Sequence, residues 1–253
     1  MRKLIIILTL FVTFLNSVNA ETVKSVSKDY KVLTKDNFTI SATLKYPKVN
    51  NKKEFKTVVL LHSLGYTSQW WGTLPDELLA KGYAVVFIDL RGHGNSVYNS
   101  QLVRTSWTSL KDKAYAKYPD DVISAIEYIK SENKRIFFKD WAIVGSDIGG
   151  STAIYVANKI QYKPKTIVLL SPLVKIKSLY IPVKLAELNN IDILSIVGAT
   201  DFKAKQTNEY LKKFAQSTYV EYESTANSNC MLLIKNDEAV SKIITEWVAE
   251  YLK

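Results

Sequence analysis

The stretch IVGSDIGGS, residues 143–151, places a single carboxylate, Asp147, between Gly145 and Gly149. It follows a short apolar run and precedes a segment with helical spacing, so it predicts a tight turn from a strand into a helix. A reactive side chain on such a strained turn needs small residues two positions away on either side, and both glycines meet that need. In this register Asp147 occupies the reactive position, whereas the side chain of Ser146 is expected to point away.

A carboxylate at that position can attack a carbon atom and form an ester with it. Release of the product then needs a histidine that activates water, because general-base assistance contributes about 10²–10⁴-fold to such a step. The chain has two histidines, His62 and His93, and both lie in its first half. The alternative role for Asp147 is structural, since aspartate often caps a helix such as the one expected to begin near Ile148.

The strands and helices that must position Asp147 follow from periodicity. Two alternating runs, residues 30–33 and 38–44, predict an antiparallel hairpin. Continuous apolar runs, typical of strands buried on both sides, cover residues 57–61, 84–90, 141–144, 166–170 and 191–197, and a last strand is expected at 218–223. Segments with helical spacing cover residues 74–81, 120–130, 152–160, 207–214 and 237–252. Strands that alternate with helices predict an α/β fold whose mostly parallel sheet has helices on both faces.

Residues 1–20 have the features of a signal peptide. Arg2 and Lys3 precede an apolar run that is too short to cross a bilayer comfortably, and small residues before Ala20 offer a cleavage site. We expect cleavage near Ala20 and export to the periplasm or the exterior, with retention as an N-terminal anchor as the alternative. Residues 21–253 then suffice for one α/β domain. The single cysteine, Cys230, excludes an intrachain disulfide and a cysteine metal cluster.

Charge and composition narrow the expected partners. The chain carries 34 basic and 24 acidic residues, a formal net charge of +10, and these residues are scattered along it. Such a charge favours loose association with anionic surfaces. No arginine-rich stripe with interleaved aromatic residues appears, so we expect no nucleic-acid partner. We also expect no membrane partner after cleavage, no cofactor and no metal. The expected partner is a small-molecule substrate or ligand, and the oligomeric state stays open.

A longer motif precedes the turn at Asp147. Residues 58–96, VVLLHSLGYTSQWWGTLPDELLAKGYAVVFIDLRGHGNS, supply a strand ending in His62, a glycine loop, a helix, a second strand and a DxRGHGxS turn. This run resembles the α/β-hydrolase superfamily, and the likeness extends over nearly the whole chain after residue 20. It is closest to small capless bacterial members of the dienelactone-hydrolase or esterase type. The resemblance implies an eight-stranded sheet, no cap domain in the short segment 173–190, and a triad of nucleophile, acid and histidine in that chain order.

Carried onto this sequence, the resemblance places the nucleophile at Asp147, the acid at Asp201 and the histidine at Asn227, or at Asn229 if the loop is slipped. Asparagine cannot carry a proton near neutral pH, so the implied triad is degenerate. Two nearby carboxylates also repel, so one of them holds a proton with a raised pKa, or a cation lies between them.

The resemblance also implies an oxyanion hole above the turn. Its expected donors are the backbone N–H groups of Ile148 and of Ser63 or Leu64. Three interpretations then stay open for Asp147. The fold is kept as a binding scaffold, which we favour because nucleophile and base are both altered. The second is an active hydrolase of a small ester, acyl or similar substrate, with His62 or a carboxylate pair as an unconventional base. The third is an oxygen-ligand cation site formed by Asp147, Asp201 and Asn227, which offers few ligands.

Other residues near these motifs are expected to be structural. His93, with Asp89 and Arg91, is expected to hold together the loop after the fourth strand. Cys230 is expected to pack as a small hydrophobic side chain, because no histidine stands in register to activate it. Trp70 and Trp71 are expected either to line the mouth of a pocket or to stack in the core.

Overall fold

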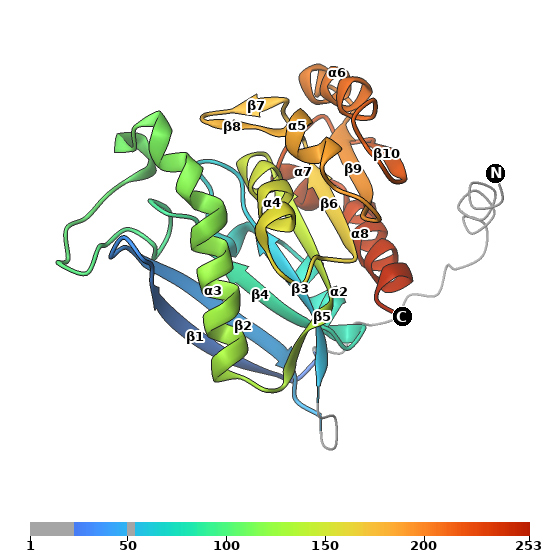
Figure 1. The fold of residues 1–253 in the computed structure, drawn as a ribbon. Helices are drawn as coiled ribbons and strands as arrows, with labels where there is room; N and C mark the ends of the chain where they lie inside the picture. The colour runs from blue at the N-terminus through green and yellow to red at the C-terminus, as the bar shows by residue number, and fades with distance from the viewer. Residues whose placement is uncertain (1–22, 50–53) are drawn as a thin grey trace.

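The apolar runs of the sequence form the strands of one mixed sheet (Figure 1). The computed structural model describes residues 23–49 and 54–253, and within them eight strands follow the order β1-β2-β4-β3-β5-β6-β9-β10. Their bounds are β1 Ser25–Leu33, β2 Thr39–Pro47, β3 Phe55–Leu61, β4 Ala84–Ile88, β5 Ile136–Ser146, β6 Thr166–Leu170, β9 Asp192–Gly198 and β10 Tyr219–Ser224. The predicted α/β-hydrolase fold is confirmed, whereas the predicted signal peptide lies outside the described residues.

The sheet has an antiparallel part and a parallel part. Strands β1 and β2 form the predicted hairpin, and β2 also runs antiparallel to β4. From β4 to β10 all neighbours are parallel. Strands β4 and β6 are buried at every residue, as the runs without a polar face predict.

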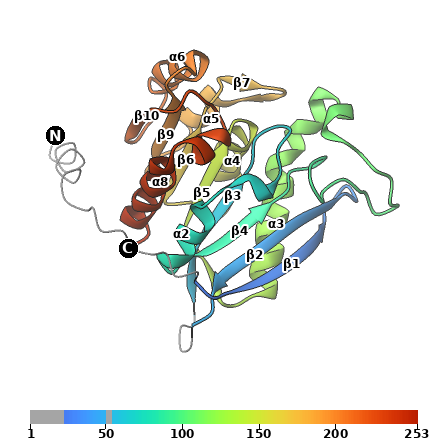
Figure 2. The same cartoon turned by 180° about the vertical axis from the view of Figure 1, so that it is seen from behind.

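Helices cover both faces of the sheet. One core contains apolar side chains of α3 (Tyr118–Glu132), α4 (Ile148–Lys159) and α5 (Ile181–Ala186), and the other contains those of α2 (Leu74–Ala80), α7 (Leu232–Asn236) and α8 (Glu238–Tyr251). Figure 1 shows α3 and α4 in front of the sheet, and Figure 2 shows α2 and α8 on the opposite side. In the described ranges no helix combines the length and apolarity needed to cross a bilayer.

Three elements differ in extent from the sequence prediction. Strand β5 starts at Ile136 rather than 141, because Phe55 pairs with Ile136 before a register shift brings Thr57 opposite Trp141. Helix α4 begins at Ile148, as the turn at Asp147 predicts, and thus four residues before the run with helical spacing at 152–160. Helix α6 (Phe202–Leu211) begins five residues earlier than predicted, because Asp201 accepts a capping hydrogen bond from the Ala204 N–H at 3.1 Å.

The segment where related folds carry a cap is small. Residues 173–190 form a short hairpin of β7 (Lys175–Ile176) and β8 (Leu179–Tyr180), followed by α5. The helix agrees with the prediction of one short helix and no cap domain, whereas the hairpin was not predicted. This segment projects beside α6 at the same end of the sheet (Figure 1), so no domain encloses the turn at Asp147.

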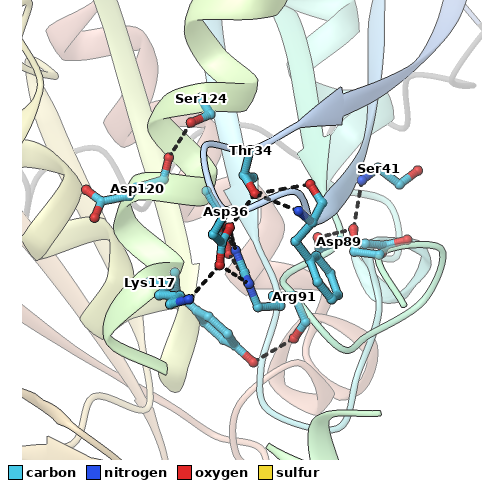
Figure 3. A network of polar contacts seen from close by, with 12 residues as sticks. Thr34, Asp36, Ser41, Asp89, Arg91, Lys117, Asp120 and Ser124 are labelled. Atoms are coloured by element: carbon cyan, nitrogen blue, oxygen red, sulfur yellow. Dashed lines mark hydrogen bonds and ion pairs between the residues drawn. The ribbon is translucent and has the colours of Figure 1, made fainter. Parts of the chain in front are cut away.

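A buried arginine, Arg91, links the turn of the β1–β2 hairpin, the loop after β4 and helix α3. The Arg91 guanidinium donates two hydrogen bonds to Asp121 at 2.6 and 2.8 Å and two to Asp36 at 2.7 and 2.8 Å. Figure 3 shows Asp36 between Arg91 and Lys117, which also contacts its carboxylate at 2.6 Å. The hydrogen bonds from Arg91 hold the pKa of the Asp36 carboxyl well below its usual range, although burial opposes this shift. Long-range contacts therefore fix the loop that carries His93.

Breaking this network should destabilise the fold far more than removing a surface ion pair. Asp121 and Asp120 are adjacent, but the Asp121 side chain is 3% exposed and pairs with Arg91, whereas Asp120 is 64% exposed and pairs with Lys159. Asp121→Asn leaves Arg91 paired with Asp36 but removes two charge-assisted hydrogen bonds in a buried site, so it should lower the free energy of unfolding by about 2 kcal/mol. Asp120→Asn should lower it by less than about 1 kcal/mol. Urea unfolding measures both values, and equal losses would contradict this account.

Candidate functional site

The turn between β5 and α4 holds Asp147 in a strained backbone conformation. Its φ of 53° and ψ of −113° lie outside the regions that ordinary residues adopt. Close packing requires glycine on either side of it. A Cβ atom on Gly145 would lie 2.4 Å from the Gly149 carbonyl oxygen, and one on Gly149 would lie 2.1 Å from the Leu61 carbonyl oxygen. The sequence therefore forms the tight strand-to-helix turn that the glycine spacing predicts, with Asp147 at its apex.

The Asp147 carboxylate binds the backbone N–H groups at the mouth of the turn. Leu64 N–H donates to its Oδ2 at 3.2 Å, and the neighbouring Ile148 N–H lowers the pKa of the carboxyl. These two N–H groups belong to the set expected to form an oxyanion hole. The Ser63 hydroxyl donates to the Ser146 hydroxyl at 2.7 Å, so the expected role of the Ser63 backbone N–H stays a prediction. The role of the Leu64 and Ile148 N–H groups as an oxyanion hole also stays a prediction, and the Leu64 N–H already donates its hydrogen bond to the Asp147 carboxylate.

Burial shifts the ionisation of this carboxyl. It raises the pKa of Asp147 to about 6, while the hydrogen bonds from Leu64 and Ile148 and the positive charge of Lys203 oppose the shift. The charge of Asp201 raises the pKa further, but it is the smallest contribution. The direction agrees with the expectation of a raised pKa in a carboxylate pair, but the main cause is burial rather than the second carboxylate.

The predicted helix cap at Asp147 is wrong. Asp147 stands at the residue before the first turn of α4, but its side chain makes no capping hydrogen bond there. The strained backbone directs the carboxylate toward the loop after β3 instead, where it meets Leu64.

Both histidines are held by the backbone. His62 Nδ1 donates to the Ser63 carbonyl at 2.8 Å, and its Nε2 accepts from the Leu90 N–H at 2.9 Å. His93 Nδ1 donates to the Arg91 carbonyl at 3.2 Å, and its Nε2 accepts from the Gly65 N–H at 3.0 Å. Burial lowers the pKa of both rings, so they stay neutral at neutral pH.

These contacts bear directly on the possible base. The His62 side chain is fully buried, both of its ring nitrogens are occupied, and no hydrogen bond joins it to Asp147 in the described part of the chain. The geometry therefore opposes a role for His62 as a general base. The structural role expected for His93 agrees with its contacts, as does that of Asp89, which accepts from the N–H groups of Ser68 and Asn95.

The other two triad positions lie together, beside a separate small pocket. Asp201 and Asn227 line a pocket of about 250 Å³ with Thr200, Ser228, Asn229, Leu232 and Asn236. Asp147 does not line it and makes no hydrogen bond to Asp201 or Asn227 within the described ranges. The charge of Asp201 nevertheless reaches Asp147, because it raises the pKa of that carboxyl, so the arrangement of these three residues as a degenerate triad stays a prediction.

Cys230 lies closer to the turn than the sequence indicates. Its backbone N–H donates to the Ser171 hydroxyl at 2.8 Å, and the Ser171 and Ser63 hydroxyls act on the pKa of its thiol. Burial, followed by the charges of Asp147 and Asp201, raises the pKa of the thiol to about 12, so it is not a thiolate at neutral pH. Cys230 is thus a polar neighbour of Asp147 rather than only a small hydrophobic side chain.

Ser171 and Lys203 are the residues that sequence reasoning missed. Ser171 follows β6, at the same end of the sheet as Asp147, and this position after a parallel strand was the available signal. Lys203 follows the predicted acid Asp201 by two residues and acts on Asp147 through its charge. In residues 23–49 and 54–253 no group of three or more His, Cys, Asp or Glu side chains is arranged to hold a metal ion.

This geometry can be compared with known proteins. The sequence profile of the family described as serine aminopeptidase, S33, matches residues 52–246. The chain belongs to this S33 family. A comparison with curated protein sequences finds no match.

Solved structures share the fold of this S33 family member. A dienelactone hydrolase from Anabaena variabilis has 16% identity and a TM-score of 0.65, with 90% of this chain and 99% of that chain covered. An esterase from Pyrococcus furiosus has 16% identity and a TM-score of 0.69, with coverage of 90% and 91%. Fungal esterases from Rhizomucor miehei have 11% identity and a TM-score of 0.69, with coverage of 92% and 85%. At these identities the likeness establishes the fold alone.

The buried Asp147 carboxyl should make the stability of the protein depend on pH. Its folded pKa of about 6 lies above the model-peptide value, so the folded state binds the extra proton and stability falls as pH rises from about 4 to about 6. Asp147→Asn removes this loss and should raise the free energy of unfolding above pH 7 by up to about 3 kcal/mol, with little effect near pH 4. Urea unfolding across this pH range measures the difference.

The matched control is Asp140→Asn, in the same strand but in an ion pair with Lys165 at the surface. It should show no such gain at high pH. A gain for Asp147→Asn that is the same at pH 4 and pH 8 would contradict the assignment to proton binding.

Proposed function

We propose that this S33 family member binds a small polar molecule beside Asp147 and does not hydrolyse it. The observation that carries the proposal is the position of the Asp147 carboxylate, which accepts the Leu64 N–H at 3.2 Å and lies near the Ile148 N–H. An oxyanion that forms during ester or amide hydrolysis needs free N–H donors. Here a carboxylate of the protein already uses them, and its negative charge repels a second anion.

The side chains around Asp147 support the same conclusion. Each imidazole has both nitrogens bound to the backbone, so neither is available to activate water. The Cys230 thiol, with its pKa raised to about 12, is a poor nucleophile at neutral pH.

Backbone strain supports a retained ligand site rather than an unused fold. Asp147, Ser171 and Cys230 all have positive φ, of 53°, 48° and 51°. Such residues each destabilise the fold by about 1–3 kcal/mol and concentrate at binding and catalytic sites. Two of them are joined by a hydrogen bond from the Cys230 N–H to the Ser171 hydroxyl, and the charge of Asp147 raises the pKa of the Cys230 thiol.

The ligand class follows from the groups at the site. Asp147 and Asp201 supply acceptors, and the side-chain amides of Asn227 and Asn229 have no hydrogen-bond partner in the described part of the chain. A small molecule with several N–H or O–H donors fits these acceptors and amides. The segment 173–190 adds no cap domain over this end of the sheet (Figure 1), and a site without a cap suits a polar ligand better than an apolar one.

Ester turnover separates this proposal from the alternative of an active hydrolase with an unconventional base. Residues 21–253 are incubated with 4-nitrophenyl acetate and butyrate, and Asp147→Ala is the matched variant. We expect both proteins to release nitrophenol at the same rate as a control protein of similar lysine content. Turnover by the unchanged chain that Asp147→Ala abolishes would overturn the binding proposal.

Intact-mass measurement gives a second readout that does not need turnover. After exposure to an alkyl bromide or an epoxide, a reactive Asp147 without a base would keep the alkyl group as an ester. We expect an unchanged mass at this residue, because the N–H groups of Leu64 and Ile148 stabilise the carboxylate where it lies. A mass increase that Asp147→Asn removes would show a working nucleophile.

We also propose that the protein acts outside the cytoplasm. The support is the pair of basic residues Arg2 and Lys3, the short apolar run after them and the small residues before Ala20. N-terminal sequencing of the chain recovered from the periplasm or medium should begin at Glu21. Recovery of the uncut chain from the membrane fraction would favour the N-terminal anchor instead.

A further inference from the structure

The chain between β4 and α3 forms a loop that extends beyond the sheet. Figures 1 and 2 show it in green, reaching past the turn between β1 and β2. Its outer part, residues 98–104, is closed by a bridge between Tyr98 and Arg104. It is also fixed to the hairpin turn, because the Ser100 N–H donates to the Asn37 carbonyl at 2.8 Å. We call residues 98–104 the projecting loop.

The tip of the projecting loop carries two exposed apolar side chains. Leu102 is 79% exposed, more than any other large apolar residue in the described part of the chain, and Val103 is 55% exposed. A single exposed apolar side chain is ordinary, but adjacent ones at the tip of a projecting loop form an apolar surface that indicates an interaction. Two side chains are too few for a stable protein interface, which buries about 800 Å² per partner.

The tip is already ordered in the shape that exposes these side chains. Leu102 has a φ of 61°, which is unfavourable for a bulky residue. The Asn99 side-chain oxygen accepts the N–H groups of Gln101 at 3.0 Å and Val103 at 2.9 Å, and the Leu102 N–H donates to the Asn99 carbonyl at 3.0 Å. Because these bonds fix the tip beforehand, it loses little conformational entropy when it binds.

Basic side chains lie in the projecting loop and in the segments packed beside it. The 3-10 helix η3 (Asp112–Lys117) is linked to the hairpin turn by the contact of Lys117 with Asp36 at 2.6 Å. Asp36 also pairs with Arg91, so Asp112 is the acid left unpaired in residues 34–38 and 98–117. Four exposed bases in or next to these segments form no ion pair within the described ranges: Lys35, Arg104, Lys111 and Lys113. This excess of positive charge complements an anionic surface.

We propose that the projecting loop docks onto an anionic lipid surface. Leu102 and Val103 enter the boundary between headgroups and acyl chains, while the four unpaired bases contact lipid phosphates. An anionic polymer would use the bases but would gain nothing from the apolar tip, so a lipid surface fits both features.

This proposal differs from the expectation of no membrane partner after cleavage. That expectation rests on charges scattered along the sequence, whereas the fold brings Lys35 beside a loop that follows it by more than sixty residues. The projecting loop is also independent of the ligand site proposed beside Asp147, so either proposal can hold without the other.

Cosedimentation with lipid vesicles at low salt tests the proposal. Residues 21–253 are used, because the apolar run before Ala20 would itself bind lipid. We expect binding to vesicles of equal parts phosphatidylcholine and phosphatidylglycerol, and much weaker binding to phosphatidylcholine alone. The double variant Leu102→Ser/Val103→Ser should bind the mixed vesicles about tenfold more weakly, because two apolar side chains no longer enter the lipid. Lys111→Gln/Lys113→Gln should also bind about tenfold more weakly and lose part of the salt dependence.

Matched controls separate the tip from general surface effects. Val183→Ser on α5 removes a valine that is 55% exposed, as Val103 is, but that lies away from the projecting loop (Figure 1). Lys134→Gln/Lys139→Gln removes two exposed lysines without ion pairs near the start of β5, in the described part of the chain. Both controls should bind the mixed vesicles as the unchanged protein does. All these side chains are exposed, so the variants should fold.

Three results would overturn the proposal. The first is no binding to the mixed vesicles, or binding that the controls weaken as much as the tip variants do. The second is binding that does not depend on Leu102 and Val103 and is matched by dextran sulfate, which would assign the bases to an anionic polymer. The third is a dimer in analytical ultracentrifugation that Leu102→Ser/Val103→Ser dissociates, which would assign the tip to self-association.

Discussion

The close approach of three backbone segments at one turn is the constraint on which the site depends. Gly145 packs against Gly149, and Gly149 packs against the end of β3 at Leu61, with no space for a Cβ at either position. This contact forces Asp147 into its strained conformation and brings the loop after β3 within hydrogen-bond reach of its carboxylate. Any larger residue at either glycine would separate the loop from the turn, so backbone packing sets the chemistry of the side chain.

The Asp147 carboxylate is held close to the Leu64 N–H in a buried position, so the residues around it must stabilise a buried charge. Leu64, Ile148 and Lys203 stabilise the anion, while burial opposes it. In the described part of the chain neither imidazole forms a hydrogen bond to the Asp147 carboxylate. The two rings instead link the loops after β3 and β4 to each other, and their centroids lie 4.9 Å apart. In this protein the two imidazole rings therefore act as neutral hydrogen-bonding links between loops and not as bases.

Much of the fold could be predicted from local patterns, and the misses have local causes. The buried strands were evident because residues such as those of β4 and β6 have no polar face. The start of β5 was missed because Lys139 and Asp140 interrupt its apolar run, and only pairing with β3 extends it. The β7–β8 hairpin was missed because each strand has two residues, too few to show a period. The serines near Cys230, Ser63 and Ser171, were not foreseen because they are far from it in sequence.

The sequence by itself determined the succession of strands and helices along the chain, the carboxylate at the tight turn and the lack of a histidine after the last strand. These are matters of residue type and spacing, which short-range sterics and periodicity translate directly. Only the tertiary structure decided where the Asp147 carboxylate points, that both imidazoles are occupied, and that Asp201 and Asn227 face a separate pocket. Hydrogen bonds between distant segments decide such matters, because a side chain's partners depend on which loops meet in space and not on its neighbours in the chain.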